Sequence, residues 1–279
     1  MGIKLVKFIK RAIKTEINFA IARVRANFLN FRSHDFYIKK YSKIPRVNSK
    51  DRVVVTLTTI PERIDKIKAT LSSLLDQTCS PDAIYLAIPK ISRITNKPYN
   101  IPEWLIDHPV IKILYCDKDY GPATKFIPAF LEEKSNLNTK IIVVDDDLIY
   151  PSFLIEYLCF YSEKYPEISI CNRGIVLSEL DGGFYADQVI NLNDSCSVVN
   201  VDVMRGEAGY LVKPKFVNQD QFFIMDKPNC LFFEDDVFIS GILAKNNIKR
   251  CCPPSFFVSN VKSGLLRTAP IKVKGLKFT

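Results

Sequence analysis

The chain has 279 residues, of which 47% are hydrophobic and 11% aromatic, so it can bury a full core and is not a disordered chain. Its eight cysteines include no CxxC pair and it has two histidines, which argues against a zinc cluster. Residues 1–50 carry 13 lysines and arginines against two acids, whereas the remainder carries 26 against 28, so the body offers no basic groove for nucleic acid.

Residues 1–50 are predicted to form a basic arm that contains an amphipathic helix. Apolar residues recur there at three- and four-residue spacing, namely Val6, Ile9, Ile13, Ile17, Ala20, Val24, Phe28 and Phe31. The apolar runs are too short to cross a bilayer, and the interspersed charges leave no segment typical of a cleaved signal peptide. Two interpretations stay open: the helix lies on an anionic membrane surface, or it packs against its own domain or a partner subunit.

From about residue 51 the pattern changes to alternating strands and helices. Strands are predicted at residues 51–58, 83–88 and 110–115, with a helix from Pro61 to Leu75 between the first two. A second helix from Pro122 to Glu133 leads to a strand at residues 141–144. This order predicts an α/β catalytic domain over residues 51–279, in which a mainly parallel sheet is flanked by helices on both faces.

Three consecutive acids, Asp145, Asp146 and Asp147, follow the strand at residues 141–144. Open α/β sheets bind ligands at the carboxyl ends of their strands. Because side chains alternate along an extended backbone, Asp145 and Asp147 are expected to face one way and Asp146 the other. Two carboxylates on one face suit a divalent cation that also holds phosphate. The alternative is an acidic turn or a helix N-cap before Pro151.

Beyond Pro151 the pattern is less regular. A helix around residues 153–158 and a strand at residues 168–170 are predicted, followed by a long loop that contains Asp181-Gly182-Gly183 and residues 191–194. A second acidic cluster, Glu234-Asp235-Asp236, directly precedes a predicted apolar helix. Taken alone, that cluster is also typical of a helix N-cap with acids that complement the helix dipole.

Four segments, VVVTLTTIPERI, DYGPATK, VVDDD and FFEDDVFISGIL, occur in the order found in GT-A fold glycosyltransferases that use nucleotide sugars. The chain resembles this family from about Val53 to Leu243. The resemblance implies a Rossmann-like GT-A sheet and a nucleoside-diphosphate sugar as donor. It also implies that Asp145 and Asp147 hold Mn²⁺ or Mg²⁺ on the donor diphosphate, and that Asp146 faces the donor or supports the site from behind.

The resemblance further implies which residues approach the donor. Thr58, Thr59 and Arg63 become candidates for contacts to its base, ribose or phosphates. Gly121 and Lys125 in DYGPATK would also approach it, with Lys125 contacting a phosphate or a sugar hydroxyl. For the first three residues the alternative roles are strand termination and a solvated cation at a helix start.

The second acidic cluster would supply the general base that deprotonates the acceptor hydroxyl. Orienting the helix so that Ile239 and Leu243 face the core favours Asp236, whereas a literal match to the family's Glu-Asp pair points to Asp235. Residues 206–210 resemble the glycine-containing strand that lines the acceptor side in relatives, and the alternative is a simple turn. Many relatives place a metal-binding histidine late in the chain, but none follows His108 here.

The function implied by the resemblance is metal-dependent transfer of a sugar to a hydroxyl of a glycan or glycolipid acceptor, with inversion, in cell-surface polysaccharide or lipopolysaccharide assembly. Retention stays open, because the base is assigned from sequence register alone. Alternative interpretations of the sequence are a nucleotidyltransferase on a related sheet, or a non-catalytic module whose arm binds a membrane or partner. Cysteines in apolar stretches, such as Cys159 and Cys171, indicate reduced thiols and hence a cytosolic location. If the arm binds a membrane, it would then lie at the cytosolic face.

Overall fold

The protein is represented by a computed structural model, which describes residues 24–25, 27–29, 31–191, 197–226, 234–254 and 271–272. Its α-helices in these ranges include α2 (His34–Tyr41), α3 (Lys68–Leu75), α4 (Ile127–Glu133), α5 (Leu154–Lys164) and α6 (Asp235–Lys245). Shorter 3₁₀ turns are η1 (Ile64–Lys66), η2 (Glu103–Leu105), η3 (Gly121–Lys125), η4 (Gly206–Ala208), η5 (Pro214–Phe216) and η6 (Gln219–Asp226).

The main sheet has eight strands in the order β3-β2-β1-β4-β11-β6-β12-β9, and all but β11 and β9 run in one direction. Its strands are β1 (Val53–Thr58), β2 (Ala83–Pro89), β3 (Ile111–Cys116), β4 (Lys140–Val143), β6 (Ile168–Cys171), β9 (Val199–Asn200), β11 (Tyr210–Val212) and β12 (Lys249–Cys252). The predicted α/β fold with a mainly parallel sheet flanked by helices is therefore confirmed.

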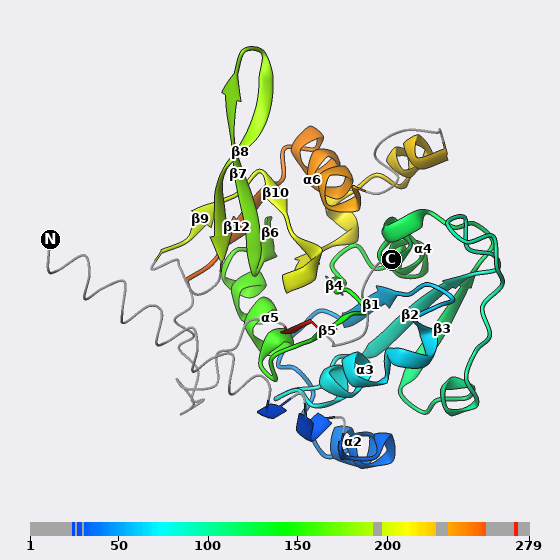
Figure 1. Ribbon diagram of the computed structural model, residues 1–279. Coiled ribbons are helices and arrows are strands. Elements are labelled where there is room, and N and C mark those ends of the chain that lie inside the picture. Colours follow the sequence, from blue (N-terminus) through cyan, green and yellow to red (C-terminus); the bar gives the residue numbers. More distant parts are fainter. Residues whose placement is uncertain are drawn as a thin grey trace, which may run out of the picture.

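Helices cover both faces of this sheet (Figure 1). Alternate side chains of β1 enter two different cores, because neighbouring residues on a strand point to opposite faces. Val53 and Val55 pack with the residues of α3 and α5, and Val54 packs with those of α4 and α6. Strands buried on both faces explain the continuous apolar runs that the sequence shows.

The predicted long loop after β6 is wrong, because the chain forms a hairpin there. β7 (Arg173–Leu180) pairs antiparallel with β8 (Gly183–Asn191), and the two strands project beyond the rest of the body (Figure 1). Asp181 and Gly182 make the turn with φ of 51° and 75°, the left-handed values that a two-residue hairpin turn requires. Residues 192–196 lie outside the described residues.

The segment predicted as a glycine-containing strand at residues 206–210 is also corrected. Residues 206–208 form the 3₁₀ turn η4, and only Tyr210 belongs to the following strand β11. Gly209 joins the two with a φ of 85°, a conformation that glycine adopts at low cost. β10 (Val203–Met204) precedes the turn and pairs with β7, whereas β5 (Leu148–Ile149) pairs with β13 (Ile271–Lys272).

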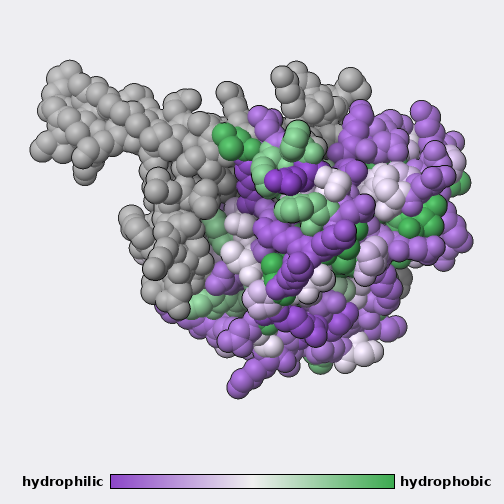
Figure 2. Space-filling view, turned by 90° about the horizontal axis from the view of Figure 1, so that it is seen from below, coloured by the Kyte–Doolittle hydropathy of each residue, from purple (hydrophilic) through white to green (hydrophobic). Residues whose placement is uncertain are grey.

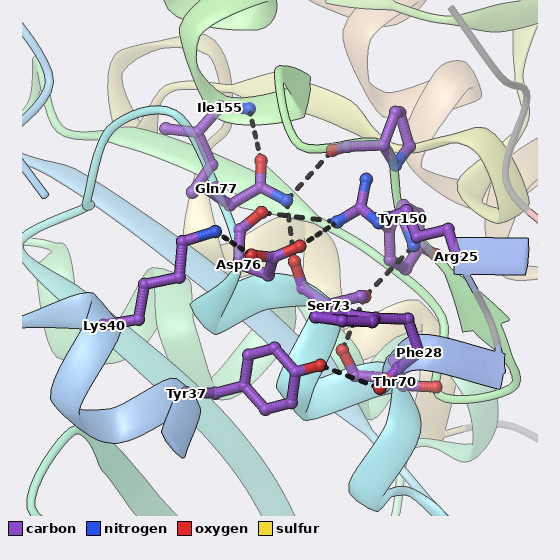
Figure 3. A network of polar contacts seen from close by, with 11 residues as sticks. Arg25, Phe28, Tyr37, Lys40, Thr70, Ser73, Asp76, Gln77, Tyr150 and Ile155 are labelled. Atoms are coloured by element: carbon purple, nitrogen blue, oxygen red, sulfur yellow. Dashed lines mark hydrogen bonds and ion pairs between the residues drawn. The ribbon is translucent and has the colours of Figure 1, made fainter. Parts of the chain in front are cut away.

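The described part of the basic arm packs on α3. Leu29 and Tyr37 are buried in the core. The Asp76 carboxylate at the end of α3 forms ion pairs with two side chains of the arm, Arg25 at 3.2 Å and Lys40 (Figure 3). This contact supports the interpretation that the arm packs on its own domain, and the boundary near residue 50 stays a prediction.

The predicted apolar stripe of the arm does not make this contact. Its members in the described part, Val24, Phe28 and Phe31, are exposed to solvent, and residues 6–20 lie outside the described residues. In the described part of the chain no helix is long and apolar enough to cross a membrane. The six cysteines in the described part of the chain are free thiols and five of them are buried, as predicted.

Both histidines of the chain meet where the arm joins the domain. The Nδ1 of His108 accepts backbone N–H groups from Val110 at 3.1 Å and Ile111 at 3.0 Å, so its proton lies on Nε2. The Nε2–H of His108 is 2.9 Å from Nε2 of His34, so the His34 nitrogen must accept this hydrogen bond. His34 therefore carries its proton on Nδ1, 3.0 Å from Ser72 Oγ of α3, and both rings are neutral.

Acidification is expected to weaken this contact. Burial and the neighbouring His108 and Lys68 lower the pKa of His34 to about 4, although Asp35 opposes the shift. In the unfolded chain histidine titrates near pH 6.5, so the stabilisation is present above that pH and is lost as the pH falls toward 4. The melting temperature should therefore fall more steeply from about pH 7 to pH 5 in the wild type than in His34→Gln. Calorimetry measures both melting temperatures, and an equal dependence on pH in the two proteins would contradict this prediction.

Candidate functional site

A cleft of about 570 Å³ opens at the carboxyl ends of β1 and β4. All ten candidate residues from the sequence line it, although they come from four separate segments of the chain. They are Thr58, Thr59, Arg63, Gly121, Lys125, Asp145, Asp146, Asp147, Asp235 and Asp236. Their convergence makes this cleft the candidate active site.

The first acidic cluster enters the cleft on a bend rather than on a strand. β4 ends at Val143, and the backbone N–H of Asp145 donates to the buried Tyr150 hydroxyl at 2.7 Å. The predicted alternation of the three acids does not hold, because the strand has already ended. Arg63 Nη1 lies 2.9 Å from Asp146 and 3.8 Å from Asp147, so these two neighbours face the same cation.

Asp146 is enclosed by polar partners. Its Oδ2 accepts the Thr59 hydroxyl at 2.5 Å, its Oδ1 pairs with Arg63, and its backbone carbonyl accepts the Thr70 hydroxyl at 2.7 Å. Burial raises the pKa of Asp146 to about 6, against the opposing effects of Arg63 and Thr59. Of its two predicted roles, these contacts favour support of the site from behind. Thr59 and Arg63 take part in that support.

Lys125 connects the two acidic clusters. Its Nζ lies 2.7 Å from Asp145 Oδ1 and 2.7 Å from Asp235 Oδ2. Burial alone would lower the pKa of this lysine, but the carboxylates of Asp145, Asp235 and Asp236 outweigh burial and raise it well above its ordinary value. Lys125 is therefore a permanent cation in the cleft. It holds the end of β4 against the start of α6, about 90 residues further along the chain.

Asp236 is held at the first turn of α6 by the segment that precedes β11. Its Oδ1 accepts the backbone N–H of Gly206 at 2.9 Å, and its Oδ2 lies 3.6 Å from Nε of Arg205. Burial raises the pKa of Asp236 to about 7, with Lys125 opposing the shift and Asp235 adding to it. A carboxylate with a pKa near neutrality is suited to accept a proton during a reaction.

Gly206 allows this close approach because it has no side chain. A Cβ there would lie 2.6 Å from Lys125 Nζ and 3.0 Å from Asp236 Oδ1. Gly206→Ala is expected to displace both groups and to destabilise the fold by about 1–3 kcal/mol, as overpacking typically does. Gly241→Ala on α6 is the control, because a Cβ there meets nothing within 4 Å. Because alanine is favoured over glycine inside a helix by about 0.5–1 kcal/mol, the control should be at least as stable as the wild type. Urea unfolding measures both variants, and a Gly206→Ala variant as stable as the wild type would show that the cluster rearranges without cost.

The DYGPATK segment forms a tight turn at the rim of the cleft. Asp119 is buried, and its carboxylate accepts the backbone N–H groups of Arg93 and Gly121, both at 2.7 Å. Gly121 takes a left-handed φ of 62°, which glycine adopts at low cost, and lines the cleft. Thr58, at the end of β1, donates its hydroxyl to the Ala87 carbonyl at 2.8 Å and also lines the cleft.

Several lining residues were not among the sequence candidates. Asp119 had a usable signal, because an acid two residues before a glycine is typical of a side-chain-stabilised turn. Arg205 and Glu207 flank Gly206. Glu207 belongs to residues 206–210, which the sequence indicated only as a region, and Arg205 lies just before them. Tyr99, whose hydroxyl donates to the Thr59 carbonyl at 3.0 Å, lies in an irregular connection with no periodic signal.

The cleft is acidic, since eight carboxylates and three cationic side chains line it. A diphosphate would therefore enter it only together with additional positive charge. Within the described ranges, no group of three or more His, Cys, Asp or Glu side chains could hold a metal ion. Asp145 and Asp147 both line the cleft, and carboxylate oxygens are ligands that Mn²⁺ and Mg²⁺ accept, with diphosphate and water supplying the others.

No protein-family description and no curated protein matches this sequence. Among solved structures, the chain is similar to a 4-diphosphocytidyl-2C-methyl-D-erythritol synthase, with a TM-score of 0.39 and 8% sequence identity. That similarity covers 69% of this chain and 87% of the other. The chemistry of the cleft must therefore be judged from its own residues.

Proposed function

We propose that this protein is a metal-dependent glycosyltransferase that moves a sugar from a nucleoside-diphosphate sugar to a hydroxyl of a glycan or glycolipid. The observation that carries the proposal is the junction of the two acidic clusters in one cleft, with Lys125 2.7 Å from both Asp145 and Asp235. The first cluster suits a metal diphosphate, and the second provides a carboxylate of raised pKa.

In the donor half of the cleft, Asp145 and Asp147 would hold the cation. Once bound, the cation would neutralise the negative charge that develops on the departing diphosphate. Lys125 would add a second positive charge near the same leaving group. Thr58, at the end of β1, and Tyr99, in the connection between β2 and β3, would contact the nucleoside. Asp146 would keep Arg63 and Thr59 in position.

In the acceptor half, Asp236 would act as the general base. Its carboxylate would take the proton from the acceptor hydroxyl while that oxygen forms a bond to the anomeric carbon of the donor sugar. The bond from the anomeric carbon to the diphosphate oxygen breaks in the same displacement, and the nucleoside diphosphate leaves with the electron pair. Such an in-line displacement inverts the anomeric configuration. Asp235, which is paired with Lys125, is less suited to this task.

We place this activity on the cytosolic side of a membrane, in assembly of a cell-surface polysaccharide or lipopolysaccharide. A thermal-shift screen of nucleoside-diphosphate sugars and nucleoside triphosphates, each with and without Mn²⁺, tests the proposal. A metal-dependent rise with a nucleotide sugar, followed by release of nucleoside diphosphate, is the expected result. Stabilisation by a nucleoside triphosphate with release of pyrophosphate would instead identify a nucleotidyltransferase.

A further inference from the structure

An exposed apolar strip runs along the described end of the basic arm. Val24, Phe28 and Phe31 follow one another at four- and three-residue spacing, and the described residues of this stretch are helical. Their side chains are 68%, 46% and 85% exposed, whereas Leu29 on the other side of the helix is 2% exposed. Phe36 of α2 is also exposed, at 38%. The buried and exposed residues separate onto two faces, so this strip is not a frayed part of the core.

The segment that carries these aromatic rings is also rich in basic side chains. Residues 24–46 contain six lysines and arginines and one acid, Asp35. The Arg32 guanidinium lies 5.2 Å from the centre of the Phe28 ring and 4.9 Å from that of Phe36. Lys39, three residues after Phe36 in α2, and Lys43, just beyond the end of α2, are also exposed. We call Val24, Phe28, Phe31, Phe36, Arg32, Lys39 and Lys43 the aromatic–basic face. In Figure 2, which views the side on which α2 lies, green apolar patches stand among purple hydrophilic residues.

The aromatic–basic face is held in a fixed position on the domain. Arg25 pairs with the Asp76 carboxylate at 3.2 Å and also donates to the Asp76 carbonyl at 3.3 Å (Figure 3). The buried Tyr37 donates its hydroxyl to the Phe28 carbonyl at 3.2 Å, which ties the helix to α2. The exposed rings therefore need little reordering before they bind a partner.

We propose that the aromatic–basic face docks on the anionic surface of a lipid bilayer. Exposed aromatic rings insert at the level of the lipid headgroups, and surrounding lysines and arginines are attracted to anionic lipids. A second copy of the chain is a poor partner for this face, because two such faces would each carry an excess of positive charge. The proposal does not depend on the chemistry of the cleft.

Sedimentation of the full chain with vesicles tests the proposal, using phosphatidylcholine alone or mixed with phosphatidylglycerol. The wild type should bind the mixed vesicles, release them at high salt, and bind the neutral vesicles weakly. Replacing Phe31 by Ser should weaken binding about tenfold or more, since Phe31 would lose its apolar contact. The double variant Lys39→Glu/Lys43→Glu should weaken it at least about thirtyfold, from about 1 kcal/mol for each lost cation.

Matched controls alter the same residue types elsewhere. Phe184→Ser removes an exposed ring from the β7–β8 hairpin, and Lys134→Glu/Lys249→Glu changes the net charge by the same amount at other exposed positions. Both should bind like the wild type, and circular dichroism checks that every variant is folded. Equal binding to neutral and anionic vesicles, equal loss in the controls, or unchanged binding after Phe31→Ser and the lysine replacements would overturn the proposal. So would self-association without vesicles that Phe31→Ser abolishes, because that would identify a second copy as the partner.

Discussion

Asp236→Asn is expected to reduce sugar transfer by about 10²- to 10⁴-fold, the usual cost of removing a general base. The amide keeps the volume of the side chain, and its oxygen can still accept the Gly206 N–H that Asp236 accepts at 2.9 Å. Folding and donor binding should therefore be retained, and only the proton-accepting step should be lost. Transfer rates at saturating donor, together with donor-induced melting shifts, separate these effects.

Asp235→Asn is the comparison that assigns the base. Asp235 Oδ2 pairs with Lys125 at 2.7 Å, so its loss should disturb the cation in the cleft but leave Asp236 able to accept a proton. The loss of transfer should be smaller than in Asp236→Asn. The reverse ranking would assign the base to Asp235. Near-normal transfer in both variants would contradict an inverting mechanism that uses this cluster.

Asp147→Asn is expected to abolish the melting-temperature rise that Mn²⁺ and a nucleoside diphosphate produce together in the wild type. A ligand at about 100 times its dissociation constant stabilises the folded state by about 2.7 kcal/mol, and that is the effect at stake. Asp147 is preferable to Asp145 for this test, because removing the Asp145 carboxylate would also release Lys125.

The matched control for the metal experiment is Asp117→Asn. Asp117 is an exposed carboxylate that pairs with Lys90 at 2.5 Å, away from the cleft lining. The Asp117→Asn variant should show the same ligand-induced rise in melting temperature as the wild type. A normal shift in Asp147→Asn would exclude this residue from the metal site, whereas a shift that needs no Mn²⁺ in the wild type would show that Lys125 and Arg63 alone hold the diphosphate.

The central strands could be predicted from sequence because they are buried on both faces. β1 and β4 are short β-branched runs with polar residues at or just beyond their ends, so both their position and the edge where they deliver side chains follow from pattern. The helix after Glu234 could also be predicted from local pattern, because acids followed by apolar residues are typical of a helix start. All ten candidate residues reached one cleft as a result.

Other features depend on tertiary contacts that no local pattern records. The strand pattern predicted alternation for the three acids, but β4 ends at Val143 and Arg63 draws Asp146 and Asp147 to one side. The ion pairs of Lys125 join residues far apart in sequence, so their geometry could not be read from spacing. The β7–β8 hairpin is different, because its Asp181-Gly182 turn was a local signal that the predicted loop overlooked.

The short strand β11 has a consequence for how the protein folds. It pairs with β4 on one side and with β6 on the other, so it joins the first half of the sheet to the second. During synthesis the strands from β1 to β4 emerge first, and the open edge of β4 stays without its neighbour until residues 210–212 follow. The same segment carries Gly206, which positions Asp236. Closure of the sheet and the positioning of Asp236 therefore both await this segment, and substitutions that weaken β11 should promote aggregation of nascent chains.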